Sequence, residues 1–482
     1  MLQIASASAV WLKLAEYSRE HGPLVTVKML NTNTIVTCDP HLVIELFEKR
    51  AINYSDREIN TMAILCDWDK DILFLSYGQK LKLYRTMLNR ALNNRVALDY
   101  VPLQENEVQK FMKHLVDEPE GFMGHVRLMR EKNTPSLAAS IAIRIAYGYK
   151  VASYDDPLVQ TAEKHMEGFS DTTQPWNWVV NMIPALRYLP DWLPILPFQR
   201  RAKEIRGIFA AHRDRPFQFA QEQIASGIAE DSFTAKLLRT EDGEPVDEDT
   251  KEHIKCIAST FYAAGSDTTV SGVQSFFLAM ALCPEIQAKA KAEMQAYAEH
   301  KWARDGTRSM IVPADRPGLP YTSALVREIL RWHPIVPLVG HRSSDQDDNS
   351  ICVEGKTYRI PARCHVLSNV WQILHDPEVY EDPDRFMPER FLVENPPPDP
   401  ENYAFGFGRR SCPGMHIAQQ SMWISISNLL ANFTITKSKD ANGQDIIPQE
   451  LYTNGTVSHP KPFVCTIIPD DGCKEWLQGM ES

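Results

Sequence analysis

The sequence of 482 residues contains no apolar run long enough to cross a lipid bilayer. A membrane-spanning helix needs about 20 such residues, and the mildly apolar stretch from Met1 to Leu14 is much shorter. This stretch also lacks the basic start and the cleavage site of a signal peptide. Its apolar residues run into Glu16 and Glu20, which predicts a short amphipathic helix that ends at Gly22-Pro23.

Paired cysteines and a basic excess are missing as well. The nine cysteines are an odd number without any C-x-x-C pattern, which argues against a disulfide framework or a structural zinc site and fits a reducing compartment. The net charge of -11 leaves no pervasive basic surface for phosphates, so the composition argues against nucleic-acid binding. The dinucleotide fingerprint G-x-G-x-x-G is also absent.

Helical periodicity dominates the middle of the chain, and short β-like runs lie on either side of it. Alternating β-branched residues predict a hairpin over 24–40, with further strands at 356–360 and 365–367. The segments 173–198 and 301–319 lack a regular pattern and predict long connections. No linker interrupts the chain, so we expect one domain over 1–482, mainly α with small peripheral β sheets. The predicted helices are 78–92, 104–116, 134–148, 157–170, 200–225, 247–282, 284–300, 320–332 and a long helix to about 432.

The most informative stretch is Phe405-Gly-Phe-Gly-Arg-Arg-Ser-Cys-Pro-Gly414, because it places Cys412 between glycine-rich turns and ahead of an apolar helical run. Free backbone N–H groups at a helix start lower the pKa of a nearby thiol. Arg409 and Arg410 add positive charge. We therefore expect a thiolate that acts as a nucleophile or a metal ligand; a buried structural cysteine in a glycine-containing loop is the simpler alternative.

A second motif, Ala264-Gly-Ser-Asp-Thr-Thr269, lies inside the predicted helix 247–282. Gly265 costs about 1 kcal/mol relative to alanine in a helix interior. The Thr268 hydroxyl can bond to the carbonyl of Ala264 and bend the helix. Together these residues can loosen the helix enough to admit water or a small ligand, with Asp267 beside it to relay protons. A kinked core helix with a polar patch is the alternative.

A third motif pairs Glu328 with Arg331 on a predicted helix, followed by the stretch Phe386-Met-Pro-Glu-Arg-Phe391. An acid and a base three residues apart on a helix usually form a surface contact of little energy. The same residues can also form a rigid arginine network if Arg390 joins them.

In their order along the chain, the three motifs resemble the signature of the cytochrome P450 family, and in particular its fungal secondary-metabolism members. The resemblance implies that Cys412 ligates the iron of heme b and that Glu328, Arg331 and Arg390 form a buried structural triad. The loop positions that carry the resemblance are Phe405, Gly408, Arg410, Cys412 and Gly414.

The resemblance also assigns residues to the haem propionates. Arg410 is expected to bind one propionate, and Arg409 to face solvent or a redox partner. Many members have W-x-x-x-R in an earlier helix, but here Leu81 takes the place of the tryptophan and only Arg85 remains. We expect Arg85 to contact a propionate with looser anchoring on this side, and His341 to be a further contact.

By the same resemblance the chain is a monooxygenase that inserts one oxygen atom from O2 into a C–H bond of a small apolar terpenoid, polyketide or indole. Thr268 and Asp267 would deliver protons, and NADPH-cytochrome P450 reductase would supply electrons. The alternatives are a haem-thiolate isomerase or dehydratase, which the intact Asp267-Thr268 pair argues against, and a non-catalytic haem-binding protein. The substrate walls are expected to include Phe261, Ala264, Val336, Leu338, Val339 and Thr456.

The remaining expectations concern assembly and location. We expect a monomer without a nucleic-acid partner. The resemblance places family members on the cytosolic face of the endoplasmic reticulum membrane, whereas the chain as given lacks the N-terminal anchor and is expected to be soluble and cytoplasmic.

Overall fold

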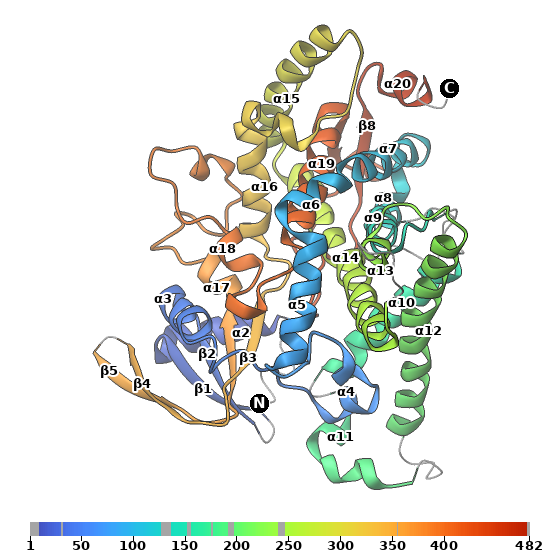
Figure 1. Cartoon of the computed structure of the whole chain (residues 1–482). Helices are drawn as coiled ribbons and strands as arrows, with labels where there is room; N and C mark the ends of the chain where they lie inside the picture. The colour runs from blue at the N-terminus through green and yellow to red at the C-terminus, as the bar shows by residue number, and fades with distance from the viewer. Residues whose placement is uncertain are drawn as a thin grey trace.

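The computed structural model describes residues 9–29, 32–126, 136–151, 156–174, 177–190, 197–239, 246–353 and 355–479. Figure 1 shows helices filling most of the molecule, with the largest sheet and a β hairpin gathered at the lower left. The molecule is therefore mainly α-helical with small sheets at its periphery, as the sequence predicts.

The helix α14 (Glu248–Leu282) runs through the centre of the helical part. Its N-terminus is capped by Asp247, whose side chain accepts a hydrogen bond from the N–H of Thr250. From Ile254 onward most of its side chains are buried, which is typical of a helix that is covered on all sides. It packs against α9 (Leu137–Tyr147), α12 (Pro197–Ala225) and α19 (Met415–Asn432).

The other helices surround this centre. Some share its main hydrophobic core, and the rest pack in three smaller core clusters. The longer ones are α2 (Val10–His21), α5 (Gln79–Leu92), α7 (Val101–Asp117), α10 (Pro157–Thr173), α15 (Pro284–Asp305) and α16 (Pro320–Trp332). The shorter ones are α3 (Pro40–Ile44), α4 (Thr61–Leu65), α6 (Asn94–Ala97), α8 (Phe122–Val126), α11 (Val179–Met182), α13 (Phe233–Leu238), α17 (Val370–Leu374), α18 (Glu401–Ala404) and α20 (Cys473–Gly479).

The largest sheet has the strand order β1-β2-β6-β3. The predicted hairpin is present as β1 (Leu24–Met29) and β2 (Thr32–Thr37), which pair antiparallel. β2 also pairs in parallel with β6 (His365–Asn369), and β6 pairs antiparallel with β3 (Leu338–Arg342). A separate core cluster lies between this sheet and α3, so the sheet anchors the segment that leads toward the cysteine loop.

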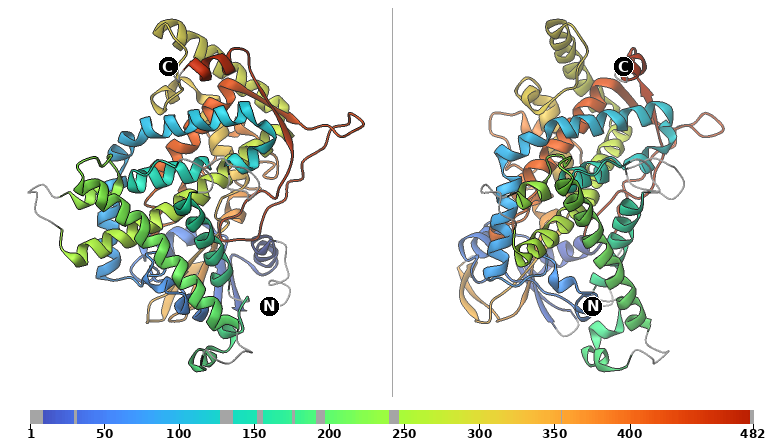
Figure 2. Two further views of the ribbon diagram at one scale, coloured as in Figure 1. Left: turned by 90° about the vertical axis from the view of Figure 1, so that its right-hand side faces the viewer. Right: turned by 45° about the vertical axis from the view of Figure 1, so that its right-hand side comes forward.

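Two smaller β pairs complete the structure. β4 (Asp348–Val353) pairs with β5 (Lys356–Ile360), and β7 (Phe433–Lys437) pairs with β8 (Cys465–Pro469). In both views of Figure 2 the segment between β7 and β8 extends away from the helices before it returns. Part of this return, residues 453–460, lies against α14 and is important for the site.

Most predicted helices agree with the structure to within a few residues, and α12 continues through Pro216. The expected connection over 301–319 is wrong in part, because α15 extends to Asp305 and a 3₁₀ helix spans Pro313–Gly318. The segment 173–198 contains α11 and a 3₁₀ helix at Pro184–Tyr188, while 175–176 and 191–196 lie outside the described residues. Residues 134–135 and the turn at 30–31 also lie outside them.

Among the described residues no single helix is both long and apolar enough to cross a bilayer. The helices α14 and α15 meet that criterion only as a pair bent by 109°.

Candidate active site

The loop that carries Cys412 is held in place by its backbone. Gly408 has φ +51, and a Cβ added there would lie 2.1 Å from the carbonyl oxygen of Phe47. No residue with a side chain fits this position without moving the backbone of Phe47. The N–H of Cys412 donates to the carbonyl of Phe405 at 2.7 Å, which closes the loop just before α19 begins at Met415. The sequence therefore fixes the position of the thiol through glycine.

Cys412 lies deep in the molecule, and yet its side chain is accessible, so it faces an internal space. Burial raises the pKa of this thiol, while the N–H of Gly414 and the charge of Arg85 lower it. The net direction is upward: the helix start lowers the pKa as expected, through the N–H of Gly414, but the second contribution comes from Arg85 instead of Arg409 and Arg410, and burial outweighs both. Desolvation disfavours a thiolate more than these partners favour it, whereas coordination to a metal deprotonates such a thiol.

The helix α14 faces the cysteine loop across Gly414. A Cβ built on Gly414 would lie 3.9 Å from a ring carbon of Phe261 and 4.0 Å from the Sγ of Cys412. One turn further along α14, Ala264 is exposed, and the Thr268 hydroxyl donates to its carbonyl at 2.9 Å. The structure thus brings the cysteine loop and the second motif to the same region, with α14 remaining helical throughout.

Three arginines near the loop carry positive charge without a carboxylate partner. Arg85 donates to the carbonyl and hydroxyl oxygens of Ser411 at 2.5 and 3.2 Å. Arg410 donates to the backbone carbonyls of Ser55 at 2.7 Å and Ile72 at 3.2 Å, and also to that of Leu75. In the described part of the chain neither forms an ion pair.

Arg57 is the third of these arginines, and in the described part of the chain it has neither a hydrogen bond nor an ion pair. Burial lowers the pKa of Arg57 to about 10. Burial, followed by the charge of Arg57, lowers the pKa of Arg410 to about 9, against a favourable contribution from Asp56. Enclosed cations that repel each other are costly unless an anion joins them. The two propionates of haem are such anions, so this region fits the cofactor that the motifs imply.

His341 lies in the same region and is buried. Its Nδ1 is 2.6 Å from the carbonyl oxygen of Tyr54, which can only accept, so Nδ1 carries the proton. Its ring stacks on Phe47 at 4.0 Å, and Nε2 has no partner among the described residues. Burial and then Arg57 hold the pKa of His341 well below its usual range. An unpaired buried nitrogen at this position is consistent with a further polar group of a ligand.

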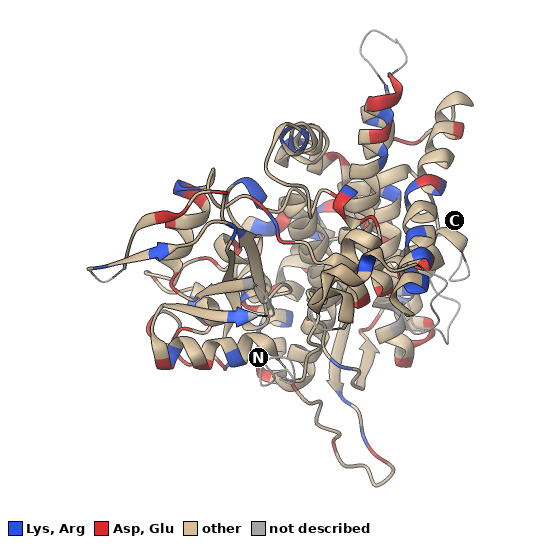
Figure 3. Cartoon of the chain, turned by 90° about the horizontal axis from the view of Figure 1, so that it is seen from below, with Lys and Arg blue, Asp and Glu red and all other residues tan. Residues whose placement is uncertain are grey.

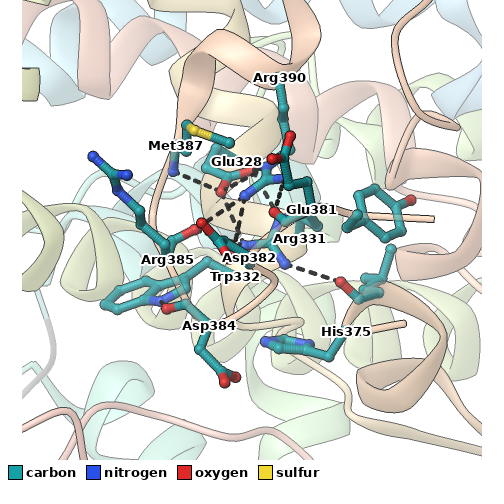
Figure 4. Close-up of polar contacts among 12 residues, drawn as sticks. Glu328, Arg331, Trp332, His375, Glu381, Asp382, Asp384, Arg385, Met387 and Arg390 are labelled. Carbon is teal, nitrogen blue, oxygen red and sulfur yellow. Dashed lines mark hydrogen bonds and ion pairs between the residues drawn. The ribbon is translucent and has the colours of Figure 1, made fainter. Parts of the chain in front are cut away.

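The third motif forms a closed polar network, shown in Figure 4. Arg331 Nε lies 2.8 Å from Glu328 Oε2 and one of its terminal nitrogens 2.9 Å from Oε1, so the pair is bidentate. Arg390 Nε lies 3.2 Å from both carboxylate oxygens, and the N–H of Met387 donates to Oε1 at 2.8 Å. All three side chains are buried, so the network joins α16 to the segment around Phe391.

The predicted substrate residues lie in three different places. Phe261 stacks on Phe233 at 5.7 Å, and Ala264 and Phe261 both lie on the side of α14 that faces the cysteine loop. Val336 and Val339 pack in the core cluster beside the largest sheet, while Leu338 points to the opposite face of that sheet.

Thr456 lies elsewhere, in the wall of a cavity of about 700 Å³ between α10, α14 and the loop 453–459. Asp267 lines the same cavity, and His459 Nε2 lies 3.2 Å from its carboxylate oxygen. His459 and Arg57 could not be predicted from the sequence motifs, because neither residue lies at a fixed distance along the chain from a motif. Only the folded chain brings them to the site.

The outer side of the cysteine loop meets solvent. Arg409 lies 4.7 Å from the ring centroid of Tyr77 and lines a shallow surface hollow with Lys49 and Ser411. In the view from below, basic and acidic residues are mixed along the ribbon (Figure 3). No cluster of three or more His, Cys, Asp or Glu suited to a metal ion occurs among the described residues. Cys412 is a candidate for a different kind of site, in which the protein provides one thiol ligand.

The fold resembles that of a zebra fish cytochrome P450 solved with abiraterone, with a TM-score of 0.70, 23% identity, and 95% of this chain and 99% of that chain covered. This likeness shows the fold alone. Sequence relatives are more informative, because several fungal proteins match almost the whole chain.

Cytochrome P450 monooxygenase claR of Ampulloclitocybe clavipes is 34% identical, covering 97% of this chain and 84% of the relative. Cytochrome P450 monooxygenase 208 of Postia placenta is 35% identical, covering 97% and 87%, and cytochrome P450 monooxygenase CLM2 of Gibberella zeae is 33% identical, covering 98% and 86%. The sequence model described as Cytochrome P450 matches residues 1–467. The chain therefore belongs to the cytochrome P450 family of monooxygenases, whose cofactor is a haem held by a cysteine thiolate.

Proposed function

We propose that this chain hydroxylates a small, mainly apolar secondary metabolite with one oxygen atom from O2, and that Cys412 is the ligand of its haem iron. One observation carries the proposal. The accessible thiol of Cys412 and the ring of Phe261 on α14 both lie next to Gly414, close to three arginines that lack an anionic partner. The thiol would bind the haem iron, and the arginines without an anionic partner would bind its two propionates.

Bound haem would supply the activation of O2, with the cysteine thiolate pushing electron density toward O–O cleavage. The residues of the chain would hold the group and exclude water around it. Arg57, Arg85 and Arg410 would bind the propionates by charge-assisted hydrogen bonds, and His341 Nε2 would face the same carboxylates. The Leu81 side chain is buried in place of the usual tryptophan, so Arg85 would make the contact on this side alone.

Thr268 and Asp267 would manage protons. The Thr268 hydroxyl donates its proton to the Ala264 carbonyl, which leaves its oxygen free to accept a second hydrogen bond from a water molecule. The adjacent Asp267 carboxyl would give its proton to that water and recover it from solvent. The reaction therefore needs a path from solvent to Asp267.

The substrate would enter an apolar space near Phe261 and Ala264, and terpenoid, polyketide and indole scaffolds suit such walls. Electrons would come from NADPH through NADPH-cytochrome P450 reductase, with Arg409 on the outer side of the loop available for docking. We propose that residues 1–482 act as one catalytic unit and as a monomer, and that the protein works at the cytosolic face of the endoplasmic reticulum membrane.

The test replaces Cys412 with serine in the haem-loaded protein and records the spectrum of its reduced carbonyl complex. Cys352→Ser is the matched control, because Cys352 is an exposed cysteine on β4, outside the loop. The control is expected to keep the thiolate signature, and Cys412→Ser is expected to lose it. A thiolate signature that persists in Cys412→Ser would overturn the ligand assignment.

Turnover is tested separately with NADPH, a fungal reductase and a library of terpenoids, polyketides and indoles. The expected product contains one oxygen atom derived from isotopically labelled O2. A rearranged or dehydrated product without the label would identify an isomerase or dehydratase instead. Haem binding with no reductase-dependent conversion of any compound would favour the non-catalytic alternative.

A further inference from the structure

The loop 453–460 presents His459 to α14 in a fixed position. Its two ends are joined by backbone hydrogen bonds, because the N–H of Thr453 donates to the carbonyl of His459 at 2.8 Å. The N–H of His459 in turn donates to the Thr453 hydroxyl at 3.0 Å. An isolated bridge between Tyr452 and Pro460 continues the pairing. This short hairpin holds the backbone of His459 on both sides.

Ser458 fastens the same hairpin to two other elements. Its carbonyl accepts a hydrogen bond from the Ser271 hydroxyl of α14. Its N–H donates to the carbonyl of Ile335 at 2.9 Å. The Ser458 hydroxyl lies 2.9 Å from Nε2 of His333, whose ring stacks on Tyr452 at 3.3 Å. These contacts are buried, so the position of the neighbouring His459 side chain is determined by the core rather than by solvent.

The His459 ring contacts the acidic residue of the second motif. Nε2 lies 3.2 Å from Oδ1 of Asp267, and the two side chains are only 5% and 16% exposed. Neither ring nitrogen makes a well-aligned hydrogen bond in the described structure. Because a buried imidazole with unsatisfied nitrogens is costly, this placement needs a reason beyond packing.

Both residues lie in the wall of the cavity of about 700 Å³ between α10, α14 and this loop. The cavity reaches the surface, because Glu167 and Ser170 of α10 line it and are exposed. Its wall is rich in polar groups, which is the condition for stable water inside a protein. The charged and titratable groups that face His459 are Asp267 on α14, His333 beyond α16, and Glu163, Glu167 and Asp171 on α10 across the cavity.

We propose that His459 is a positioning residue for Asp267, and that this cavity is the route by which solvent protons reach its carboxylate. In this role an N–H at Nε2 of His459, which lies 3.2 Å from Oδ1, attracts the carboxylate and keeps it at the wall of the cavity. A cavity water then transfers a proton to the carboxylate and is reprotonated from bulk solvent. The inference rests on the proposed role of Asp267 as the proton donor of the reaction.

The experiment uses the haem-loaded protein with four variants: His459→Phe, His459→Gln, Asp267→Asn and the exposed control His300→Gln on α15. Phenylalanine fills the buried space without a donor, whereas glutamine retains an N–H donor. The loss of a hydrogen bond to a charged group changes the ratio of two competing outcomes by about tenfold. We therefore expect the ratio of peroxide to product to rise by about tenfold in His459→Phe, and to stay near the wild-type value in His459→Gln and His300→Gln.

Two readouts separate positioning from general support of the fold. The solvent deuterium isotope effect on NADPH oxidation is expected to rise in His459→Phe and in Asp267→Asn, which a loss of packing would not cause. The unfolding temperature of His459→Phe/Asp267→Asn is expected to equal that of the less stable single variant, because both substitutions break the same contact. This measurement needs no turnover.

The outcomes are distinguishable. The role of His459 would be overturned if the two single substitutions lowered the unfolding temperature additively in the double variant. It would also be overturned if His459→Phe gave the same peroxide ratio and isotope effect as His300→Gln. If the wild-type protein oxidises no NADPH with any reductase, the proposed function fails instead. The unfolding temperatures then still decide whether His459 holds Asp267.

Discussion

Neutralising Glu328 is expected to weaken both the fold and haem retention. The carboxylate accepts two hydrogen bonds from Arg331, one bifurcated hydrogen bond from Arg390 Nε and one from the N–H of Met387. Glu328 and Arg331 have no exposed surface. Glutamine has nearly the same shape, so Glu328→Gln removes the charge and leaves two arginines buried without an anion. Breaking a buried pair in this way costs about 3–5 kcal/mol.

The size of this cost determines the assay. A chain of 482 residues has an unfolding entropy of about 1 kcal/mol per kelvin, so the loss corresponds to a fall of about 3–5 °C in unfolding temperature. Thermal unfolding of the haem-loaded variant is therefore measured together with its haem-to-protein ratio, which is expected to decrease. The arginines contact the segment that leads to the cysteine loop, so their displacement also disturbs the cofactor site.

Glu389→Gln is the matched control. Glu389 lies on the same 3₁₀ turn (Pro388–Phe391) and pairs with Lys289 at 2.6 Å, but the two side chains are 37% and 59% exposed. An exposed pair contributes about 0–1 kcal/mol, so this variant is expected to unfold within about 1 °C of the wild type. If Glu328→Gln matched this control in both unfolding temperature and haem content, the network would be no more than a set of weak contacts.

Two further predictions concern the cysteine loop and a buried acid. Gly408→Ala is expected to lower haem content and unfolding temperature more than Gly443→Ala. Both glycines have positive φ, but of the two only Gly408 would place a Cβ against a backbone oxygen. Equal losses would mean that φ strain of about 1–2 kcal/mol is the whole effect. Asp71 accepts hydrogen bonds from Thr260 and from the N–H of Leu73, and burial raises its pKa to about 6. Its contribution to stability is complete below about pH 4 and is lost as the pH rises through about 6. Asp71→Asn is therefore expected to increase the free energy of unfolding at pH 7.5 by up to about 3 kcal/mol, and so to raise the unfolding temperature there. At pH 4 the unfolding temperature is expected to stay unchanged. The opposite dependence on pH would refute the assignment.

Local patterns in the sequence predict the helices and the motif positions well, because both depend on residues close together in the chain. The periodicity of 320–332 coincides with α16, and Pro216 did not prevent the prediction of α12. Pairing across long distances is different. The parallel contact between β2 and β6 joins Thr34 to His365, and no spacing within either strand specifies that partner. The sequence therefore predicts strands but not the sheet.

The same distinction explains the errors in the candidate site. The motif predicts the role of Cys412, but the pKa of its thiol depends on how deeply the finished fold encloses it and on Arg85 from another helix. Arg57 and His459 carry no motif, since their partners come from distant segments. The charge of Arg57 lowers the pKa of Arg410, and burial raises the pKa of the Cys412 thiol. Both costs would decrease when haem binds, because its iron would stabilise the thiolate and its two propionates would stabilise the arginines. The site is therefore expected to be less stable empty than loaded, and haem binding contributes directly to the stability of this part of the fold.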